Sequence, residues 1–265
     1  MTDALPEQKN AITALVEAPA PTEVKDVVTR LKDLQAEMER FNGRSDNPVA
    51  SFNQLYTTIT REVDQHLTET KFQDPDFMTT LDLRFAERYF SALQQWNDRS
   101  AWAPRCWSAL FNRWNDDDMA PILGAVAGVT AHIQFDLGAA LVQTFREIGG
   151  PVLDDSSARK ADYDILNDIF AEKIPTLRRG FLEGNLFADW FDRLTGTLDD
   201  VFQSASIEAA RASSWKTAKQ LWQLRDDPDA YSAQVRSLDG LTEGIIGGLF
   251  FFLDNPLGNR ALGSN

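Results

Sequence analysis

Apolar residues recur every three or four positions along most of this chain, which is the spacing of helices that bury one face. No convincing stretch alternates apolar and polar residues as a half-buried strand does. A weak helical pattern covers residues 1–17 and a clear one covers 23–41. Further helices are predicted near 49–69, 75–97, 104–114, 117–148, 158–173, 186–203, 204–225 and 228–253. The pattern predicts an all-α protein, a multi-helix domain packed around a long central apolar helix over 117–148.

Prolines, glycines and short polar residues mark the boundaries of these elements. Asp-Pro pairs open two of the helices and place proline in the first turn. The stretch "EAPAPTE" reads as a linker that ends with Thr22 as a helix N-cap. Gly149-Gly150-Pro151 ends the central helix and starts a polar loop over 149–160, which is either a lid or a simple connection. We expect a flexible N-terminal arm and Pro/Ala linker over 1–21, a single helical domain over 22–254, and a C-terminal tail over 255–265.

The central helix carries two polar residues among small and apolar ones. His132 and Asp136 are four positions apart, so they share a helix face. That face comprises Gly128, Val129, His132, Asp136, Ala139, Ala140 and Gln143. The small residues let neighbouring helices approach closely, and a carboxylate buried there must be paired, hydrogen-bonded or metal-bound. The pair either satisfies itself and holds the helix register, or it faces a ligand.

Other helices also place polar side chains on apolar faces. Asp82 falls with Phe85 and Tyr89, Tyr56 stacks with Thr60, Asp162 aligns with Ile165, and Asn167 aligns with Tyr163. Each has an ordinary structural explanation, such as a first-turn aspartate stabilised by the helix dipole or a tyrosine at the edge of the core. Taken together, Asp82, His132, Asp136 and Asp162 would form an acidic cluster with a single imidazole.

Four segments of the sequence look like successive blocks of one family. "FNQLYTTITREV", "FQDPDFMTTLDLRFAERYFSAL", "AVAGVTAHIQFDLGAALVQT" and "ADYDILNDIF" resemble a helical domain-of-unknown-function family common in actinobacteria, over roughly residues 50–170. Similarity is weaker over 208–221. The hallmark block of that family reads approximately Gly-Met-Asn-Ala-His-Ile-Asn-x-Asp-Leu, and it matches Gly128, Ala131, His132, Ile133, Asp136 and Leu137. Val129-Thr130 and Gln134 depart from it. The resemblance implies no activity, but it strengthens the interpretation of His132 and Asp136 as a functional site.

The charge balance narrows the range of partners. Asp and Glu total 40 against 26 Lys and Arg, a formal net charge of −14, which disfavours binding to nucleic acid or anionic membranes. The single cysteine, Cys106, excludes an internal disulfide and fits a reducing compartment. The N-terminus lacks the pattern of a secretion signal, and the apolar run Ile245–Leu253 has about half of the ~20 residues that span a bilayer. We expect a cytoplasmic protein with no nucleic-acid or membrane partner; the oligomeric state stays open.

Histidine content limits metal chemistry. His132 and Asp136 resemble one element of the helical zinc phospholipase C fold, but that fold needs several histidines and this chain has only His66 and His132. The acidic "NDDDMAP" segment is better explained as the start of a helix than as a terpene-cyclase motif. No Glu-x-x-His pair and no glycine-rich phosphate loop is present. We expect no cofactor, with a single divalent metal at His132 and Asp136 as the open alternative.

These features favour a non-redox small-molecule enzyme of specialised metabolism, a lyase, cyclase or hydrolase. His132 would be the general acid/base and Asp136 would orient it. The predicted substrate-binding residues are Tyr56, Asp82, Tyr89, Asp162 and Asn167. Two alternatives remain: a non-catalytic ligand-binding or interaction module in which the His–Asp pair is structural, and a mononuclear metal-dependent hydrolase.

Overall fold

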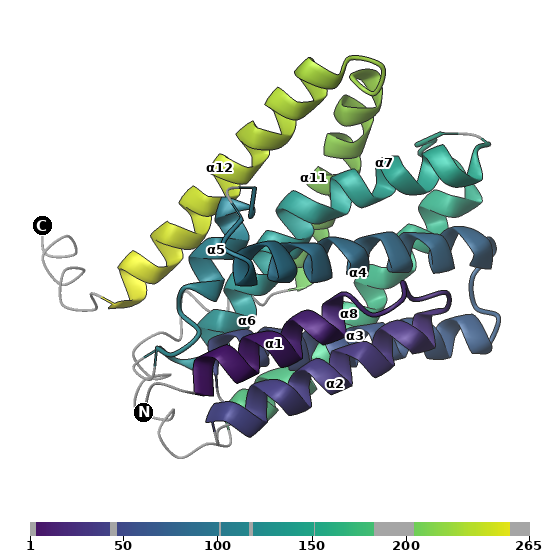
Figure 1. The fold of residues 1–265 in the computed structure, drawn as a ribbon. Coiled ribbons are helices and arrows are strands. Elements are labelled where there is room, and N and C mark those ends of the chain that lie inside the picture. The colour runs from purple at the N-terminus through teal and green to yellow at the C-terminus, as the bar shows by residue number, and fades with distance from the viewer. Residues whose placement is uncertain are drawn as a thin grey trace, which may run out of the picture.

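The computed structural model describes residues 4–42, 47–100, 102–116, 119–150, 152–182 and 204–254, and every regular element among them is helical (Figure 1). The elements are α1 (Ala4–Val16), α2 (Val24–Asn42), α3 (Pro48–Thr68), α4 (Pro75–Asn97), α5 (Arg105–Phe111), α6 (Pro121–Thr130), the π-helical segment η1 (Ala131–Asp136), α7 (Leu137–Ile148), α8 (Ala158–Leu182), α11 (Ser204–Gln223) and α12 (Pro228–Asp254). The all-α prediction is confirmed. The helix predicted over 186–203 and the tail over 255–265 lie outside the described residues.

Side-chain caps start several helices where the sequence indicates. Asp74 accepts a hydrogen bond from the Phe77 amide (3.0 Å), and Asp227 accepts one from the Ala230 amide (3.0 Å). The proline after each aspartate occupies the first turn, where its missing N–H costs nothing. The same local chemistry starts α3, because Asn47 caps the Val49 amide at 2.8 Å.

The continuous run of α6, η1 and α7 forms the centre of the protein. It packs against α3 and α4 on one side and against α11 and α12 on the other. Of the two purple helices in Figure 1, α2 packs on α3, and α1 packs on α2 and α4. A side chain on Gly124 would clash with the Pro48 backbone, and one on Gly128 would clash with the Phe52 ring. These small residues therefore bring α3 and α6 into close contact, as the sequence predicts.

Hydrophobicity of the central helix is explained by this packing. By length and composition Pro121–Ile148 could cross a membrane, and it is the one such helix among the described residues. However, 83% of its most apolar 18-residue window is buried inside the protein. The apolar residues of this helix therefore form part of the protein core.

The central helix is not regular throughout. The sequence predicts one α-helix over 117–148, whereas the structure begins it at Pro121 and inserts a π-helical turn over Ala131–Asp136. A π-turn leaves a backbone carbonyl without its usual partner. Here the Ser214 hydroxyl of α11 lies 2.6 Å from the Ile133 carbonyl and donates to it. The distorted turn is therefore contacted by a residue 81 positions away, and local periodicity does not encode such a contact.

The N-terminal segment differs from the expected flexible arm over residues 4–16. These residues form α1, which packs on α2 and α4 and buries Ile12 and Val16 in the core. Asn97 also donates to the Lys9 carbonyl at 2.8 Å. The helical pattern of α1 is weak, and contacts made far along the chain hold the helix in place.

The polar loop between the central helix and α8 is tied to its surroundings. Arg159 pairs with Asp74 (2.7 Å) and donates to the Gly149 carbonyl (2.6 Å). Asp155 accepts from the Trp215 indole (2.9 Å) and the Lys219 ammonium (2.7 Å). These contacts favour a fixed connection over a lid.

Candidate functional site

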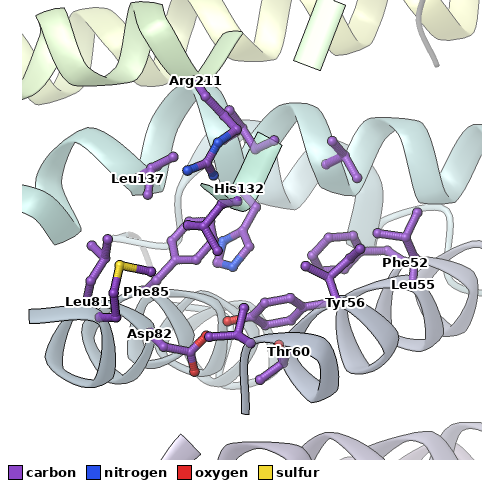
Figure 2. A pocket seen from close by; sticks show the side chains of 16 residues that line it. Phe52, Leu55, Tyr56, Thr60, Leu81, Asp82, Phe85, His132, Leu137 and Arg211 are labelled. Carbon is purple, nitrogen blue, oxygen red and sulfur yellow. The ribbon is translucent and has the colours of Figure 1, made fainter. Parts of the chain in front are cut away.

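A small cavity lies where α3, α4 and η1 meet, between the two clusters of buried apolar side chains. Its volume is about 50 Å³, and its walls are mostly apolar. The polar residues on it are Tyr56, Thr60, Asp82, His132 and Arg211, and Figure 2 shows the first four directed into one space. The apolar lining residues are Phe52, Leu55, Ile59, Val63, Met78, Leu81, Phe85, Val129, Ile133, Leu137 and Leu166.

Behind the cavity, the expected His132–Asp136 pair forms. His132 Nδ1 lies 3.0 Å from Asp136 Oδ2. The carboxylate of Asp136, only 1% exposed, also accepts hydrogen bonds from Arg88 Nε (3.1 Å) and Trp107 Nε1 (2.8 Å). Donors from η1, α4 and α5 thus satisfy a buried charge that would be costly if unpaired. Asp136 is thereby a fixed, ionised support for the imidazole.

The other ring nitrogen of His132 faces the cavity without a partner. Burial lowers the pKa of His132, and the hydrogen bond and charge of Asp136 only partly oppose this shift. A neutral ring whose Nδ1–H donates to Asp136 leaves Nε2 as a bare acceptor. Among the described residues, no hydrogen-bond donor reaches that Nε2 atom. The ring is held on Phe85, stacked with the centroids 3.4 Å apart, and meets the edge of Tyr56 at 4.6 Å.

Asp82 supplies the opposite chemistry. It is buried, and its Oδ2 atom has no hydrogen-bond partner in the described part of the chain. Burial, assisted by the charge of Asp64, raises the pKa of Asp82 to about 8. Its carboxyl group is therefore mostly protonated at neutral pH and can donate a hydrogen bond or a proton.

Two hydroxyl groups complete the polar set. Tyr56 Oη and Thr60 Oγ1 are buried, and neither finds a hydrogen-bond partner within the described ranges. The pKa of Tyr56 is raised well above its usual value, first by burial and then by the charge of Asp82. The nearby Thr60 hydroxyl opposes the shift, although the two hydroxyls do not reach regular hydrogen-bond geometry. The phenol thus stays protonated and remains a donor. Buried polar atoms normally have partners, so four such atoms on one cavity indicate a place where a ligand or water binds.

The sequence-predicted site residues separate into three groups. Tyr56, Asp82 and His132 line the cavity, and Asp136 supports His132 from behind. Tyr89 does not line it; its ring packs on Phe52 and Trp107. Asn167 also lies off the cavity wall and accepts from Arg211 Nε at 2.8 Å.

The predicted acidic cluster of four residues does not assemble, because Asp162 has a different role. Its carboxylate accepts hydrogen bonds from the Gln73 and Asp74 amides, at 2.9 and 2.6 Å. Asp162 thus holds the start of α4 against α8. A buried aspartate on an apolar helix face gives the same sequence signal whether it faces a cavity or a loop backbone.

Sequence reasoning missed Arg88, Trp107 and Arg211. Arg88 falls on a different face of α4 from Asp82, and that face points at Asp136. From the sequence pattern alone, Trp107 is interpreted as an ordinary aromatic residue of the core. A buried carboxylate such as that of Asp136 requires several hydrogen-bond donors. This requirement predicts that such partners exist, but it does not identify them.

The residues described here do not converge as metal ligands. No group of three or more His, Cys, Asp and Glu side chains in these ranges is arranged to hold a metal ion. His132 Nδ1 and Asp136 Oδ2 face each other, and the Arg88 guanidinium contacts the other oxygen of Asp136. A cation bound between His132 and Asp136 would have to displace these contacts, so this donor set does not fit a metal as arranged.

Comparison with known proteins identifies the family. The sequence model of a family of unknown function (DUF5995) matches residues 24–249, so the chain belongs to that family. The resemblance to a helical domain-of-unknown-function family is confirmed, while the actinobacterial distribution and the hallmark block stay predictions. No curated protein and no solved structure matches the chain.

Proposed function

We propose that this member of the family is a non-redox small-molecule enzyme whose reaction is an acid–base step in the His132 cavity. One observation carries the proposal: an unpartnered, buried imidazole nitrogen faces a cavity while the other nitrogen is fixed by an ionised carboxylate. This is the arrangement that a general base requires. The protein would be cytoplasmic, with a small molecule as its partner.

Each residue of the site has its own role in the proposed reaction. His132 Nε2 accepts a proton from the substrate, and Asp136 stabilises the imidazolium that forms because Arg88 and Trp107 keep that carboxylate in place. The protonated Asp82 carboxyl donates a proton to a substrate oxygen, and Tyr56 donates a hydrogen bond to the same region (Figure 2). Lyases, cyclases and hydrolases each include reactions that begin with such a proton transfer.

The size of the cavity limits what enters it. A cavity of about 50 Å³ holds roughly four water molecules, since each needs about 10–15 Å³ on this measure. It therefore accepts the reacting end of a molecule. Of the described lining residues, Phe85 and Val129 alone are half-buried, so the remainder of the substrate would extend past these two side chains.

A second candidate function is a ligand-binding or interaction module without chemistry. The saturation of Asp136 by three donors favours it, because such a network also fixes the packing of α4, α5 and η1. The arrangement of His132 and Asp136 does not favour a mononuclear metal hydrolase, and elemental analysis of protein purified without chelators tests this directly: close to one transition metal per chain would restore that alternative.

Histidine NMR tests the proposed base directly, because the chain has only two histidines. In protein labelled with ¹⁵N-histidine, we expect His132 to be neutral at pH 7 with the proton on Nδ1, while His66 on α3 serves as the internal reference. A predominantly Nε2-protonated or cationic His132 would contradict the general-base assignment.

Turnover is tested with a defined library of uncharged metabolites that carry carbonyl, ester, epoxide or hydroxyl groups. Wild type and His132→Gln are incubated with the library, and mass spectrometry compares what each consumes. We expect at least one compound to be consumed by the wild type and not by the folded variant. Ligand-induced shifts of the His132 signal without consumption would favour the binding module.

A further inference from the structure

A second cavity lies at the end of the bundle where α1 meets the C-terminal end of α4 and the turn after α5. Its volume is about 750 Å³, within the roughly 300–1,000 Å³ typical of small-molecule sites. None of its lining residues lines the His132 cavity. It is therefore a separate candidate site, independent of the proposed function.

Three side chains on this cavity hold buried polar atoms without partners. Gln8 Nε2, Asn97 Oδ1 and Trp114 Nε1 make no hydrogen bond within the described residues, although each side chain is more than nine-tenths buried. Asn97 is held in a fixed orientation, because its Nδ2 donates to the Lys9 carbonyl (2.8 Å) and to Thr13 Oγ1 (2.7 Å). The site thus offers two donors, Gln8 and Trp114, and one acceptor, Asn97.

Aromatic rings form part of the wall. Trp96 and Trp114 are stacked, with centroids 5.7 Å apart and planes inclined by 12°. The Trp96 indole donates to Asn112 Oδ1 at 2.9 Å, which fixes the ring. The stacking covers one face of each indole and Trp114 is buried, so the half-buried Trp96 ring supplies the apolar surface beside the amide groups on which the C–H face of a ring-shaped ligand packs.

Charges around the cavity balance. Lys9 and Arg99 are basic, and Asp98 and Asp116 are acidic. The Lys9 ammonium lies 5.5 Å from the Trp96 ring centre, and Asp116 pairs with Arg113. Among the lining residues that the structure describes, two basic and two acidic side chains balance, so neither sign dominates.

From these contacts we propose that the cavity binds a neutral polyhydroxylated ring, a monosaccharide or cyclitol. A hydroxyl group is both donor and acceptor, so neighbouring hydroxyls on one ring satisfy Gln8, Trp114 and Asn97 together. The ring's apolar face packs on the half-buried Trp96 indole. The amides Asn112 and Asn115 at the rim reach the remaining hydroxyls.

The test is ligand-observed and ¹⁹F NMR on the full chain labelled with 5-fluorotryptophan, with the Trp96 and Trp114 signals assigned by single Trp→Phe variants. The probes are D-glucose, D-galactose and myo-inositol, with glucose 6-phosphate and adenosine as the charged and planar comparisons. We expect the neutral rings to shift both signals. Tighter binding of glucose 6-phosphate or adenosine, or no shift with any neutral ring, would overturn the proposal.

Two variants each remove one hydrogen-bond donor from the cavity, and a third variant serves as the control. Gln8→Leu and Trp114→Phe are each expected to weaken binding about tenfold, as the loss of one buried hydrogen bond predicts. Gln54→Leu, at an exposed glutamine of α3, should leave the affinity unchanged. Equal affinities in all folded variants would contradict the assignment of Gln8 and Trp114.

Discussion

The central cavity beside His132 and the end cavity beside Trp96 differ in size, in wall chemistry and in the groups that face them. The central cavity is small and apolar and contains groups that ionise, namely His132, Asp82 and Tyr56. The end cavity is about fifteen times larger by volume, 750 against 50 Å³, and its unpartnered groups are two amides and an indole that do not ionise. An enclosed apolar wall shifts proton affinities, whereas neutral amides and indoles supply recognition. On this difference rest our two proposals, acid–base chemistry in the first cavity and binding in the second.

Removing the support of the central site should produce the largest effect. Asp136→Asn leaves Arg88 without its buried carboxylate and disturbs the contacts of Trp107 and His132. We expect a loss of about 3–5 kcal/mol in the free energy of unfolding, measured by urea denaturation. Asp33→Asn, at an exposed position of α2, is the matched control and should change it by less than about 0.5 kcal/mol. A loss below about 1 kcal/mol for Asp136→Asn would show that the network is not a structural centre.

The second prediction concerns pH. The folded pKa of Asp82, about 8, exceeds the ordinary value of 3.8, so the folded state binds more protons between these limits. The contribution of Asp82 to stability is therefore complete below about pH 4 and is lost as the pH rises to about 8, at up to ~1.4 kcal/mol per pH unit. Asp82→Asn should remove this slope in urea denaturation from pH 5 to pH 8.

The variant His132→Gln distinguishes the effect of Asp82 on the pH dependence of stability from that of His132. The pKa of His132 is lowered, so its contribution runs in the opposite direction: it is present above the unfolded value of 6.5 and is lost as the pH falls below that value. His132→Gln should therefore increase the decline in stability with pH, whereas Asp82→Asn should reduce it. Parallel pH profiles for wild type and Asp82→Asn would mean that Asp82 is not protonated in the folded protein.

A smaller effect distinguishes an unpartnered hydroxyl from a partnered one. Thr60→Val removes a buried hydroxyl without a partner and keeps the side-chain shape, so we expect a gain of about 1 kcal/mol in the free energy of unfolding. Thr144→Val is the control, because the equally buried Thr144 hydroxyl donates to the Ala140 carbonyl (2.9 Å). That variant should be neutral or slightly destabilised. The same response in both variants would indicate that a water already satisfies Thr60.

The sequence predicts those features that depend on local spacing. Helical periodicity gives the elements, Asp-Pro pairs give two helix starts, and an i, i+4 spacing pairs His132 with Asp136. Tyr56 and Asp82 lie on the apolar faces of α3 and α4, and both reach the cavity as expected.

The remaining features depend on contacts between distant parts of the chain. Arg88 and Trp107 reach Asp136 from 48 and 29 residues away, and Ser214 supports the π-turn from α11. Asp162 meets the Gln73 and Asp74 amides instead of the cavity, because burial alone does not say which donors a carboxylate meets. Such pairings follow from packing angles between helices, which composition and periodicity leave open.

The smallest expected effect on stability belongs to the rim of the end cavity. Asn115 is exposed there, so Asn115→Ala should change the free energy of unfolding by less than about 0.5 kcal/mol while lowering affinity for a neutral sugar. Asn112→Ala removes the acceptor of the Trp96 indole and should weaken binding further, because the ring is no longer fixed. Thermal melts and sugar titrations on the same samples measure both quantities. A stability loss above about 1 kcal/mol for Asn115→Ala would place the end cavity within the cooperative core, and the division between a chemical and a recognition cavity would then fail.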